Sequence, residues 1–421
     1  MLREELYDQV KKLIDKCNRC GFCRSVCPSL AELGWESTSP RGRVFLVGEV
    51  LAGRIPLTGD VVSRIDQCLL CRNCMAVCPV GGKIDQVIIA FRQLAAQEMG
   101  VATSKKLMLN MLSDHRGLCD VMAPVAAVLE HIPFKETPGG GAIFRLNKKM
   151  RLLPMFGGKP LMSQFQHIKV DKPIKKVAFY VGCYINYMGV NVGRAVLNIL
   201  ARNGVEVVIP QTQTCCGVPF FASGMVEKAV TLVRQNIDAL EEANVDAVIY
   251  ACGSCGTGLK EWARHPEIGS EYAEKAKKLE EKTFEIGEFL IDQLEVKELP
   301  SLPKPTRVTY HDSCHLAVGA GVIEQPRTLL KMMGNAEYIE MPEANTCCGM
   351  GGLFSVNHYD LSRKINSRKI DKIMSVNPQV VTSGCPGCNL HIMDGLNKAG
   401  SDIVTSHYIE LINNAYDCAQ E

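Results

Sequence analysis

The sequence has no long hydrophobic run, few aromatic residues and almost no net charge. Its longest apolar stretches, such as 123–129 and 245–252, are far shorter than the roughly 20 residues that cross a bilayer. Aromatic residues make up 6% of the 421, so stacking platforms for nucleic-acid bases are not expected. The net charge of +2 gives no argument for an acidic partner. The first residues mix both charge signs without the apolar core of a secretory signal. We expect a cytoplasmic protein, able to lie against the inner face of the cell membrane but not to cross it.

Nucleotide-binding fingerprints are missing as well. No G-x-G-x-x-G follows a predicted strand, and no P-loop is present. We therefore expect neither a flavin nor a nicotinamide on this chain. Any hydride chemistry must then belong to a partner.

Cysteine is the one residue type in clear excess, with 20 copies. Disulfides explain such numbers in small secreted proteins, but this chain is large and shows no export signal. A reducing compartment keeps thiols free. Free thiols at regular spacings indicate metal ligands.

Two runs near the N-terminus share one spacing. Residues 17–28 read CNRCGFCRSVCP and residues 68–79 read CLLCRNCMAVCP, both C-x2-C-x2-C-x3-C-P. This spacing holds two [4Fe–4S] cubes in bacterial ferredoxins, where the fourth cysteine of each run binds the other cluster. We predict cluster one at Cys17, Cys20, Cys23 and Cys78, and cluster two at Cys68, Cys71, Cys74 and Cys27. Zinc, which takes paired C-x2-C knuckles, is the alternative.

A helix is predicted between these runs, over residues 39–53, from the apolar spacing that follows Pro40. Arg41 and Arg43 lie in its first turn. They either neutralise cluster charge or belong to a solvated helix start, and the sequence leaves both open.

From residue 175 the chain alternates between short apolar strands and longer helical stretches, and the pattern occurs twice. Strands are predicted at 175–183, 205–210 and 245–252, then at 306–314, 336–342 and 378–385; helices are predicted at 192–204, 225–244, 324–335 and 361–377. This is an internal duplication. Alternating strands and helices imply parallel sheets covered by helices.

Each copy carries five cysteines at matching intervals. The first copy has Cys183, Cys215, Cys216, Cys252 and Cys255; the second has Cys314, Cys347, Cys348, Cys385 and Cys388. They follow predicted strand ends, where ligands collect in such sheets. Five thiolates exceed the four ligands of zinc, and adjacent cysteines can bind two irons of one cluster. We predict an iron–sulfur cluster in each half, with zinc or inert buried thiols as alternatives. Cys119 and Cys418 lie outside every set and are expected to be free thiols.

The complete order, two ferredoxin motifs followed by two C-x31–32-C-C-x35–36-C-x2-C copies, resembles the iron–sulfur subunits of glycolate oxidase and of lactate-utilisation complexes. It is related to the catalytic iron–sulfur subunit of heterodisulfide reductase. The resemblance implies a non-cubane [4Fe–4S] cluster on each set of five cysteines. It also implies electron transfer between a partner FAD subunit, which oxidises a 2-hydroxy acid, and a quinone or other carrier. The domains that carry such a set of five cysteines are named CCG after their Cys-Cys-Gly stretch. The alternative is a heterodisulfide reductase subunit with the cluster of a CCG domain as its active site.

The predicted fold class is α/β. We expect a ferredoxin-like domain at 1–100, a helical and basic connecting segment at 101–174, and CCG cysteine-rich domains at 175–300 and 301–421. Residues 145–176 carry nine Lys or Arg and one Asp, a local charge of +8. This segment either binds a membrane or partner surface or is a solvated linker.

The stretch HDSCH places His311 and His315 around Cys314. Either histidine can hydrogen-bond near the cluster, deliver a proton or bind iron. Asp312 is expected to orient a histidine or to cap a helix.

Overall fold

The computed structural model describes residues 3–114, 116–130, 134–136, 141–144 and 151–419. These residues form two compact units, each assembled from separate stretches of the chain. The stretches are Met1–Leu109, Gly217–Ala229 and Thr346–Lys369 in the first unit, and Asn110–Cys216, Val230–Asn345 and Ile370–Glu421 in the second. The four domains expected from the sequence are a separate division, which stays a prediction.

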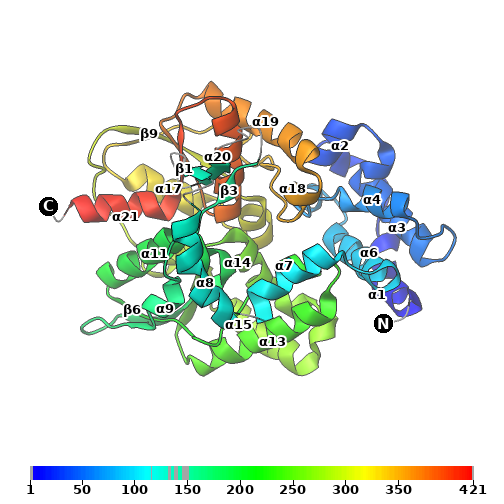
Figure 1. The fold of residues 1–421 in the computed structure, drawn as a ribbon, viewed down its shortest axis with the longest axis horizontal. Helices are drawn as coiled ribbons and strands as arrows, with labels where there is room; N and C mark the ends of the chain where they lie inside the picture. The colour runs from blue at the N-terminus through cyan, green and yellow to red at the C-terminus, as the bar shows by residue number, and fades with distance from the viewer. Residues whose placement is uncertain (1–2, 115, 131–133, 137–140, 145–150, 420–421) are drawn as a thin grey trace. The chain divides into compact units, whose positions relative to one another are not determined.

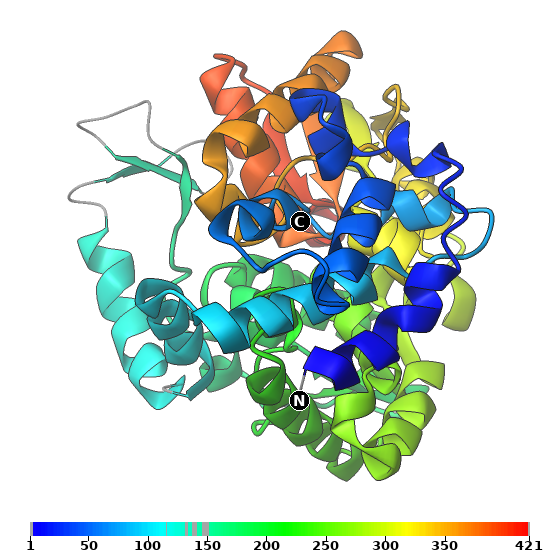
Figure 2. The same cartoon turned by 90° about the vertical axis from the view of Figure 1, so that its right-hand side faces the viewer.

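The first unit is helical. Its helices α1 (Arg3–Asp15), α3 (Pro40–Leu51) and α6 (Ile84–Met99) pack on one another (Figure 1; blue and light blue in Figure 2). Leu6, Val47 and Phe91 are fully buried in their shared core. The other helices that lie wholly or mostly in this unit are α2 (Pro28–Leu33), α4 (Gly59–Asp66), α5 (Asn73–Ala76), α7 (Thr103–Asp114), α12 (Val218–Phe221), α18 (Phe354–Asn357), α19 (Tyr359–Ser375) and the 3-10 turns η1 (Phe22–Arg24) and η2 (Glu36–Thr38).

Local chemistry explains where α3 begins. Pro40 occupies its first turn, where a missing amide hydrogen costs nothing, and the Ser39 hydroxyl accepts a hydrogen bond from the Gly42 amide. The helix predicted after Pro40 is therefore confirmed.

The second unit contains two larger sheets. The first sheet has the order β4-β6-β5-β7-β8, in which β4 is antiparallel to β6 and the other pairs are parallel. Its strands are β4 (His167–Ile168), β5 (Lys175–Tyr180), β6 (Val205–Val208), β7 (Ala247–Tyr250) and β8 (Thr283–Glu285). All four residues of β7 are buried, as expected of a parallel strand covered by helices on both faces.

The second sheet repeats the arrangement with the order β10-β9-β11-β12, all parallel. Its strands are β9 (Thr306–His311), β10 (Ala336–Tyr338), β11 (Val380–Ser383) and β12 (Val404–His407). The predicted fold class and strand–helix alternation are confirmed. Two parallel edge strands, β8 and β12, were not predicted, because each is short and has polar residues.

Helices cover these sheets and connect the two copies. They are α8 (Arg116–Leu129), α9 (Leu161–Gln164), α10 (Gly182–Tyr187), α11 (Val190–Arg202), α13 (Val226–Glu242), α14 (Gly253–Glu261), α15 (Ser270–Glu281), α16 (Ile286–Glu288), α17 (Glu324–Met332), α20 (Pro386–Lys398) and α21 (Tyr408–Cys418), with the 3-10 turns η3 (Trp262–Arg264) and η4 (Pro266–Ile268) and the π-helices η5 (Phe289–Gln293) and η6 (His315–Ala320). Helix α11 packs on α21, and α14 packs on η6. The Thr257 hydroxyl of α14 donates to the His315 carbonyl at 2.7 Å, so polar as well as apolar contacts join the two copies.

The connecting segment contains a feature that was not predicted. Strands β1 (Phe134–Glu136), β2 (Gly141–Phe144) and β3 (Leu153–Pro154) form a small antiparallel sheet in addition to the helices. The basic segment 145–176 was predicted either to bind a membrane or partner surface or to be a solvated linker, and its first residues, 145–150, lie outside the described residues.

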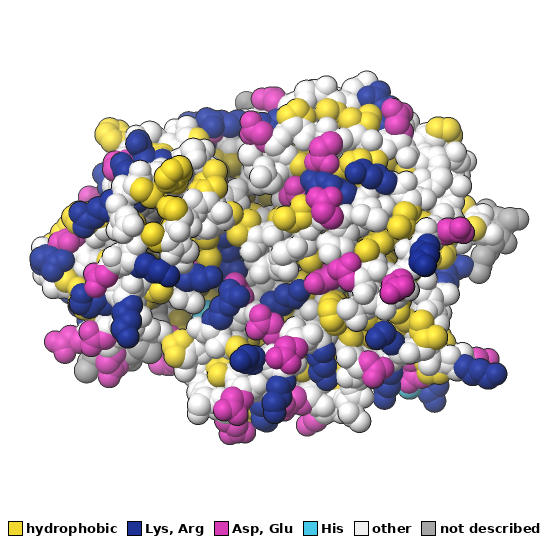
Figure 3. Space-filling view, turned by 180° about the vertical axis from the view of Figure 1, so that it is seen from behind, with side chains coloured by type: hydrophobic (Ala, Val, Ile, Leu, Met, Phe, Trp, Pro, Cys, Tyr) yellow, Lys and Arg dark blue, Asp and Glu magenta, His cyan; other side chains and the backbone are white. Residues whose placement is uncertain are grey.

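The surface is mixed in charge. Figure 3 shows basic and acidic side chains interspersed on one face, in keeping with the net charge of +2. Within the described part of the chain, no helix combines the length and apolar character needed to cross a lipid bilayer.

Gly256→Ala is expected to destabilise the second unit strongly. A methyl group at Gly256, in α14, would overlap the Tyr250 ring, which is itself fully buried. Such overpacking costs about 1–3 kcal/mol or more of unfolding free energy. The matched control is Gly117→Ala in α8, where no atom lies within 4 Å of the added methyl group; it should stabilise by about 0.5–1 kcal/mol. Urea unfolding measures both, and equal effects would contradict the packing seen around α14.

Candidate metal centres

The two ferredoxin-like loops share one feature of backbone conformation. The residues on either side of the second cysteine are left-handed in both loops, Arg19 and Gly21 around Cys20 (φ 54° and 92°). The second loop repeats this with Leu70 and Arg72 around Cys71 (φ 55° and 65°). Left-handed residues other than glycine cost about 1–3 kcal/mol each and concentrate at functional sites. Such turns point successive backbone N–H groups to one side, which favours an anionic group there.

The eight cysteines of these loops line two cavities in the first unit. The first cavity is lined by Cys17, Cys20, Cys23 and Cys78, and the second by Cys27, Cys68, Cys71 and Cys74. The fourth cysteine of each run thus faces the cavity of the other run. This is the grouping that the sequence predicted for two clusters.

The thiols around each cavity are crowded. Burial raises the pKa of Cys74 well above its usual value, and repulsion from the charges of Cys71, Cys68 and Cys27 raises it further. Burial likewise raises the pKa of Cys68, although the Arg43 and Arg92 guanidinium groups oppose this shift. Four thiols that hinder one another's ionisation become stable thiolates once a metal cation binds them. The donor sets therefore fit metal clusters.

The two arginines of α3 lie in different surroundings. Arg43 is 1% exposed and lines the second cavity. Arg41 lines the first cavity, retains 27% of its side-chain exposure and forms an ion pair with Glu36 at 2.7 Å. A solvated helix start is therefore wrong for Arg43, because the turn of α3 that carries it is packed into the core.

One contact links the second cavity to the CCG motif of the second copy. The thiol of Cys71 is hydrogen-bonded to that of Cys347, which, together with burial, raises the pKa of Cys71 well above its usual value. Both residues belong to the first unit. A cysteine of the ferredoxin type and one of a Cys-Cys pair are thus direct neighbours.

The five cysteines of the first copy come together at the carboxyl edge of the first sheet. Cys183 opens α10 after β5, the Cys215–Cys216 pair follows β6, and Cys252 and Cys255 begin α14 after β7. Hydrogen bonds join the thiols of Cys183 and Cys215, of Cys216 and Cys255, and of Cys252 and Cys255. The set therefore converges as predicted for a single site.

Glycine allows one close approach within this set. A Cβ atom at Gly182 would lie 2.9 Å from the Cys255 sulfur, and its φ of 66° is left-handed. A side chain at this position would therefore displace the Cys255 sulfur.

Three buried polar side chains hold the Cys215–Cys216 turn, and sequence reasoning missed all of them. Asn236 in α13 accepts from the Thr214 amide at 2.7 Å and donates to the Cys215 carbonyl at 2.9 Å. The Trp262 indole N–H donates to the Cys216 carbonyl at 3.1 Å. Gln213 accepts from the Val181 amide at 2.8 Å. Asn236 could have been found, because it is a polar residue on the buried apolar stripe of α13.

The C-x2-C pairs of the two copies touch each other. Cys385 caps α20 as Cys252 caps α14, and hydrogen bonds from Cys252 and Cys388 lower the pKa of Cys385 well below its usual value. Cys314 caps η6 in the same unit. Cys347 and Cys348 belong to the first unit, so convergence of the five cysteines of the second copy stays a prediction.

Of the residues around Cys314, Asp312 has a different role from the one predicted. The His311 ring lies 3.2 Å from the Ala344 carbonyl, and the His315 ring lies 3.2 Å from the Ser254 hydroxyl. Asp312 accepts two hydrogen bonds from Arg327, at 2.7 and 2.8 Å. The helix cap or histidine-orienting role expected for Asp312 gives way to this buried ion pair, which the sequence spacing did not reveal.

The two cysteines outside the sets have ordinary surroundings. Cys119 is buried in α8 and donates to the Met111 carbonyl at 3.3 Å. Cys418 lies at the end of α21, 3.7 Å from the Asn414 side-chain oxygen. No described contact joins either one to a cysteine set.

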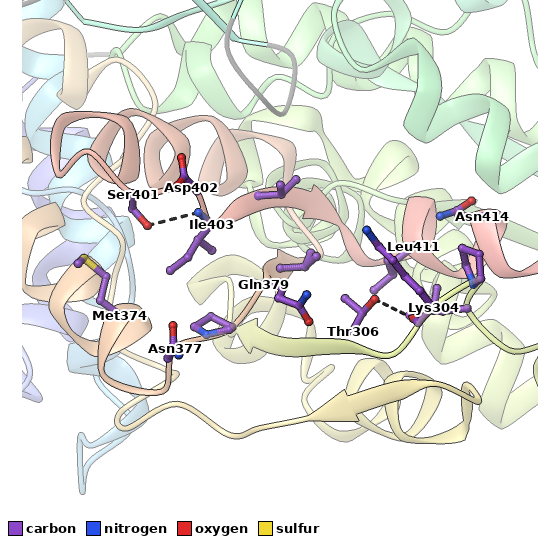
Figure 4. Close-up of a pocket in the computed structure, with 15 residues that line it drawn as sticks. Lys304, Thr306, Met374, Asn377, Gln379, Ser401, Asp402, Ile403, Leu411 and Asn414 are labelled. Atoms are coloured by element: carbon purple, nitrogen blue, oxygen red, sulfur yellow. Dashed lines mark hydrogen bonds between the residues drawn. The ribbon is translucent and has the colours of Figure 1, made fainter.

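A larger cavity of about 680 Å³ lies at the opposite edge of the second sheet (Figure 4). Its lining includes Thr306, Val380 and Val404, the first residues of β9, β11 and β12. Figure 4 also shows Lys304, Asp402 and Asn414 at its wall. No cysteine lines this cavity, so it is separate from the metal sites.

Comparisons with known proteins agree with these sites. The cysteine-rich domain family, CCG, matches residues 177–260 and 308–393, and the 4Fe-4S dicluster domain family matches residues 13–82. The second of these matches shows that the chain is an iron–sulfur protein.

Three curated proteins are similar to the chain. The probable glycolate oxidase iron-sulfur subunit of Bacillus subtilis is 30% identical, with 94% of this chain and 93% of that protein covered. One of the subunits of the fumarate reductase (CoM/CoB) of Methanothermobacter marburgensis is 29% identical over 99% of this chain and 75% of that protein. Lactate utilization protein A of Geobacillus sp. is 36% identical over 57% of this chain and 99% of that protein.

Proposed function

The chain belongs to the family of glycolate oxidase iron–sulfur subunits, and from that membership we propose that it is the electron-transfer subunit of a flavin-dependent 2-hydroxy-acid dehydrogenase complex. An FAD-binding partner oxidises glycolate or lactate in this proposal. The chain then passes the electrons to a quinone or another carrier. It is an oxidoreductase subunit that needs a partner for the hydride step.

Four groups of cysteines hold the electron carriers in this proposal. Two cubane [4Fe–4S] clusters are bound by the sets that line the two cavities of the first unit, and one further [4Fe–4S] cluster, of non-cubane type, is bound by each set of five cysteines. Bound clusters of this kind accept and release single electrons. The residues contribute thiolate ligands, and they exclude water, since most of these thiols are buried.

The observation that carries the proposal is the contact between Cys71 and Cys347. In this proposal Cys71 is a ligand of a cubane cluster and Cys347 is a ligand of a CCG cluster, so the contact supports a close approach of the two carriers. Electrons that reach the second cavity then have a short route to the second CCG motif. The further contact between Cys252 and Cys385 supports exchange between the two CCG sites.

An exposed apolar face on α8 supports the proposal that the chain binds partner subunits in a complex. Leu118, Val121, Val125, Val128 and Leu129 are between 53% and 72% exposed. Their spacing puts them along one side of the helix. Apolar surface of this kind marks protein contacts more often than open solvent.

The test uses the complex purified anaerobically with its partner subunits. Addition of glycolate or lactate should produce the electron paramagnetic resonance (EPR) signals of reduced clusters. The same acids should leave the isolated chain oxidised, because it lacks the flavin. A complex whose clusters stay oxidised with every 2-hydroxy acid, but are reduced by dithionite, would contradict the proposal.

The second candidate is a heterodisulfide reductase subunit with a CCG cluster as active site. Both copies have a complete set of five cysteines, and one relative is named for CoM/CoB chemistry. In this reaction two electrons and two protons convert a disulfide into two thiols. Thiol release from a heterodisulfide by the dithionite-reduced complex, without any oxidation of hydroxy acids, would favour this candidate.

A further inference from the structure

Arg43 is a buried cation that no carboxylate of the described residues neutralises. Its side chain is 1% exposed, and Nε donates to the Arg64 carbonyl at 3.2 Å while Nη2 donates to the Ser29 hydroxyl at 3.0 Å. Both acceptors are neutral. Within the described residues, no Asp or Glu forms an ion pair with Arg43. A charge buried without a counter-charge is strongly unfavourable, so a buried anion should lie close to it.

The second cavity supplies the place for that anion. Arg43 lines it together with Cys27, Cys68, Cys71 and Cys74. Asp85 also lines the cavity, but its carboxylate already pairs with Arg72 at 2.9 Å. A cubane held by four thiolates has a net negative charge, and this charge increases on reduction. It would neutralise the guanidinium that the protein leaves unpaired.

A hydrogen-bond chain joins Arg43 to one of the thiols. The Ser29 hydroxyl accepts from Arg43 and lies 3.4 Å from the Cys27 sulfur. Because its oxygen is engaged by Arg43, its hydrogen is free to be donated to a Cys27 thiolate. Hydrogen bonds to cluster sulfur and nearby positive charge are both known to raise reduction potentials.

Among the described residues that line the first cavity, no cation is both buried and unpaired. Arg41 is paired with Glu36 there and is partly exposed. Arg19 and Lys83 also line that cavity, but neither is buried, so water screens their charges. The two cavities therefore share a cysteine pattern and differ in electrostatics.

We propose that Arg43 is the buried counter-ion of the cluster held by Cys27, Cys68, Cys71 and Cys74, and that it raises the reduction potential of this cluster above that of the other cubane. The inference rests on the proposed function and adds to it the direction of electron transfer, from the first cubane to the second. A cluster held in the second cavity would then accept an electron more readily than one held in the first, with no bond broken or formed and no proton moved, and that electron would lie close to Cys347.

The test compares Arg43→Gln with Arg43→Lys in the full iron-loaded chain. An anaerobic potentiometric titration followed by EPR should show a lower midpoint potential for one cubane in Arg43→Gln, with the other cubane unchanged. Arg43→Lys keeps the charge and should recover most of the shift. The matched control is Arg54→Gln, which removes an exposed guanidinium that pairs with Glu49 at 2.6 Å and lines neither cavity, and it should shift neither potential strongly.

Several outcomes would overturn the inference: no shift in Arg43→Gln, equal shifts of both cubanes, or a shift of the same size in Arg54→Gln. If Arg43→Gln does not fold, Ser29→Ala provides the second test. It breaks the chain to Cys27 while keeping the charge, and it should lower the same potential by a smaller amount; an unchanged potential would count against the inference. The titration uses dithionite and no hydroxy acid, so its result is independent of the test of the proposed function.

Discussion

Cys27→Ala is expected to remove the cubane of the second cavity, although Cys27 belongs to the first run of cysteines. Its side chain lines the same cavity as Cys68, Cys71 and Cys74. A [4Fe–4S] cube needs four ligands, so the variant should lose about four irons per chain. The cubane of the first cavity should keep its EPR signal, because Cys78 completes its ligand set.

Double variants distinguish this arrangement, in which the fourth cysteine of each run binds the other cluster, from one in which each run of four cysteines binds its own cluster. Cys27→Ala combined with Cys71→Ala removes two ligands of one cube and should cost about four irons, while Cys27→Ala combined with Cys20→Ala should cost about eight. If each run bound its own cluster, the first double variant would lose about eight irons and the second about four. Cys418→Ala, outside every cysteine set, is the control and should leave the iron content unchanged.

The central strands of the second unit could be predicted because their buried surroundings require a continuous run of apolar residues, which is visible in the sequence. A parallel strand covered on both faces must be apolar throughout, as β7 is with Ala247–Tyr250. The edge strands β8 and β12 have no such continuous apolar run. Thr283 and His407 have polar side chains that hydrogen bonds satisfy within the fold, and a sequence does not display those partners.

The candidate sites were predictable to the extent that they are local. The spacing of the cysteines follows from the geometry of one loop or one strand end. The contacts of Cys71 with Cys347 and of Cys252 with Cys385 join residues that are far apart in the chain. Only the packed structure brings them together. The same holds for Asp312, whose partner Arg327 lies on another element.

Arg43 shows the difference between a residue type and its environment. The sequence allowed either a solvated arginine or one that compensates cluster charge. Burial rejects the first interpretation, because the turn of α3 that holds Arg43 packs into the core while the same helix exposes Arg41. Helical periodicity alone did not separate them, since they are only two residues apart.

Glu285→Gln is expected to stabilise the chain at alkaline pH and to have little effect at acidic pH. Glu285 ends β8 and is fully buried. Burial raises the pKa of its carboxyl from 4.5 to about 7, even though the Tyr408 hydroxyl and the amides of Gly287 and Glu288 donate hydrogen bonds to it. Glutamine resembles the protonated form, so it avoids the cost of ionisation in the core.

The sign of the effect follows from linkage. Between pH 4.5 and about 7 the folded chain keeps a proton on Glu285 that the unfolded chain has lost. The contribution of this proton to stability is therefore lost as the pH rises through that window, by about 3 kcal/mol for a shift of this size. Below pH 4.5 both states are protonated, and the variant and the natural chain should differ little.

His407 produces the opposite slope in an overlapping range, so the pH profile of the natural chain alone does not isolate Glu285. Burial lowers the pKa of His407 from 6.5 to about 4, and its ring lies 3.0 Å from the Ala251 carbonyl and accepts from the Ile409 amide. Stability from the neutral ring is gained as the pH rises from 4 to 6.5. Its contribution cancels in the difference between Glu285→Gln and the natural chain. That difference, measured by urea unfolding at pH 4 and pH 8, should be near zero at the first pH and largest at the second; equal differences at both would show that Glu285 ionises normally in the folded chain.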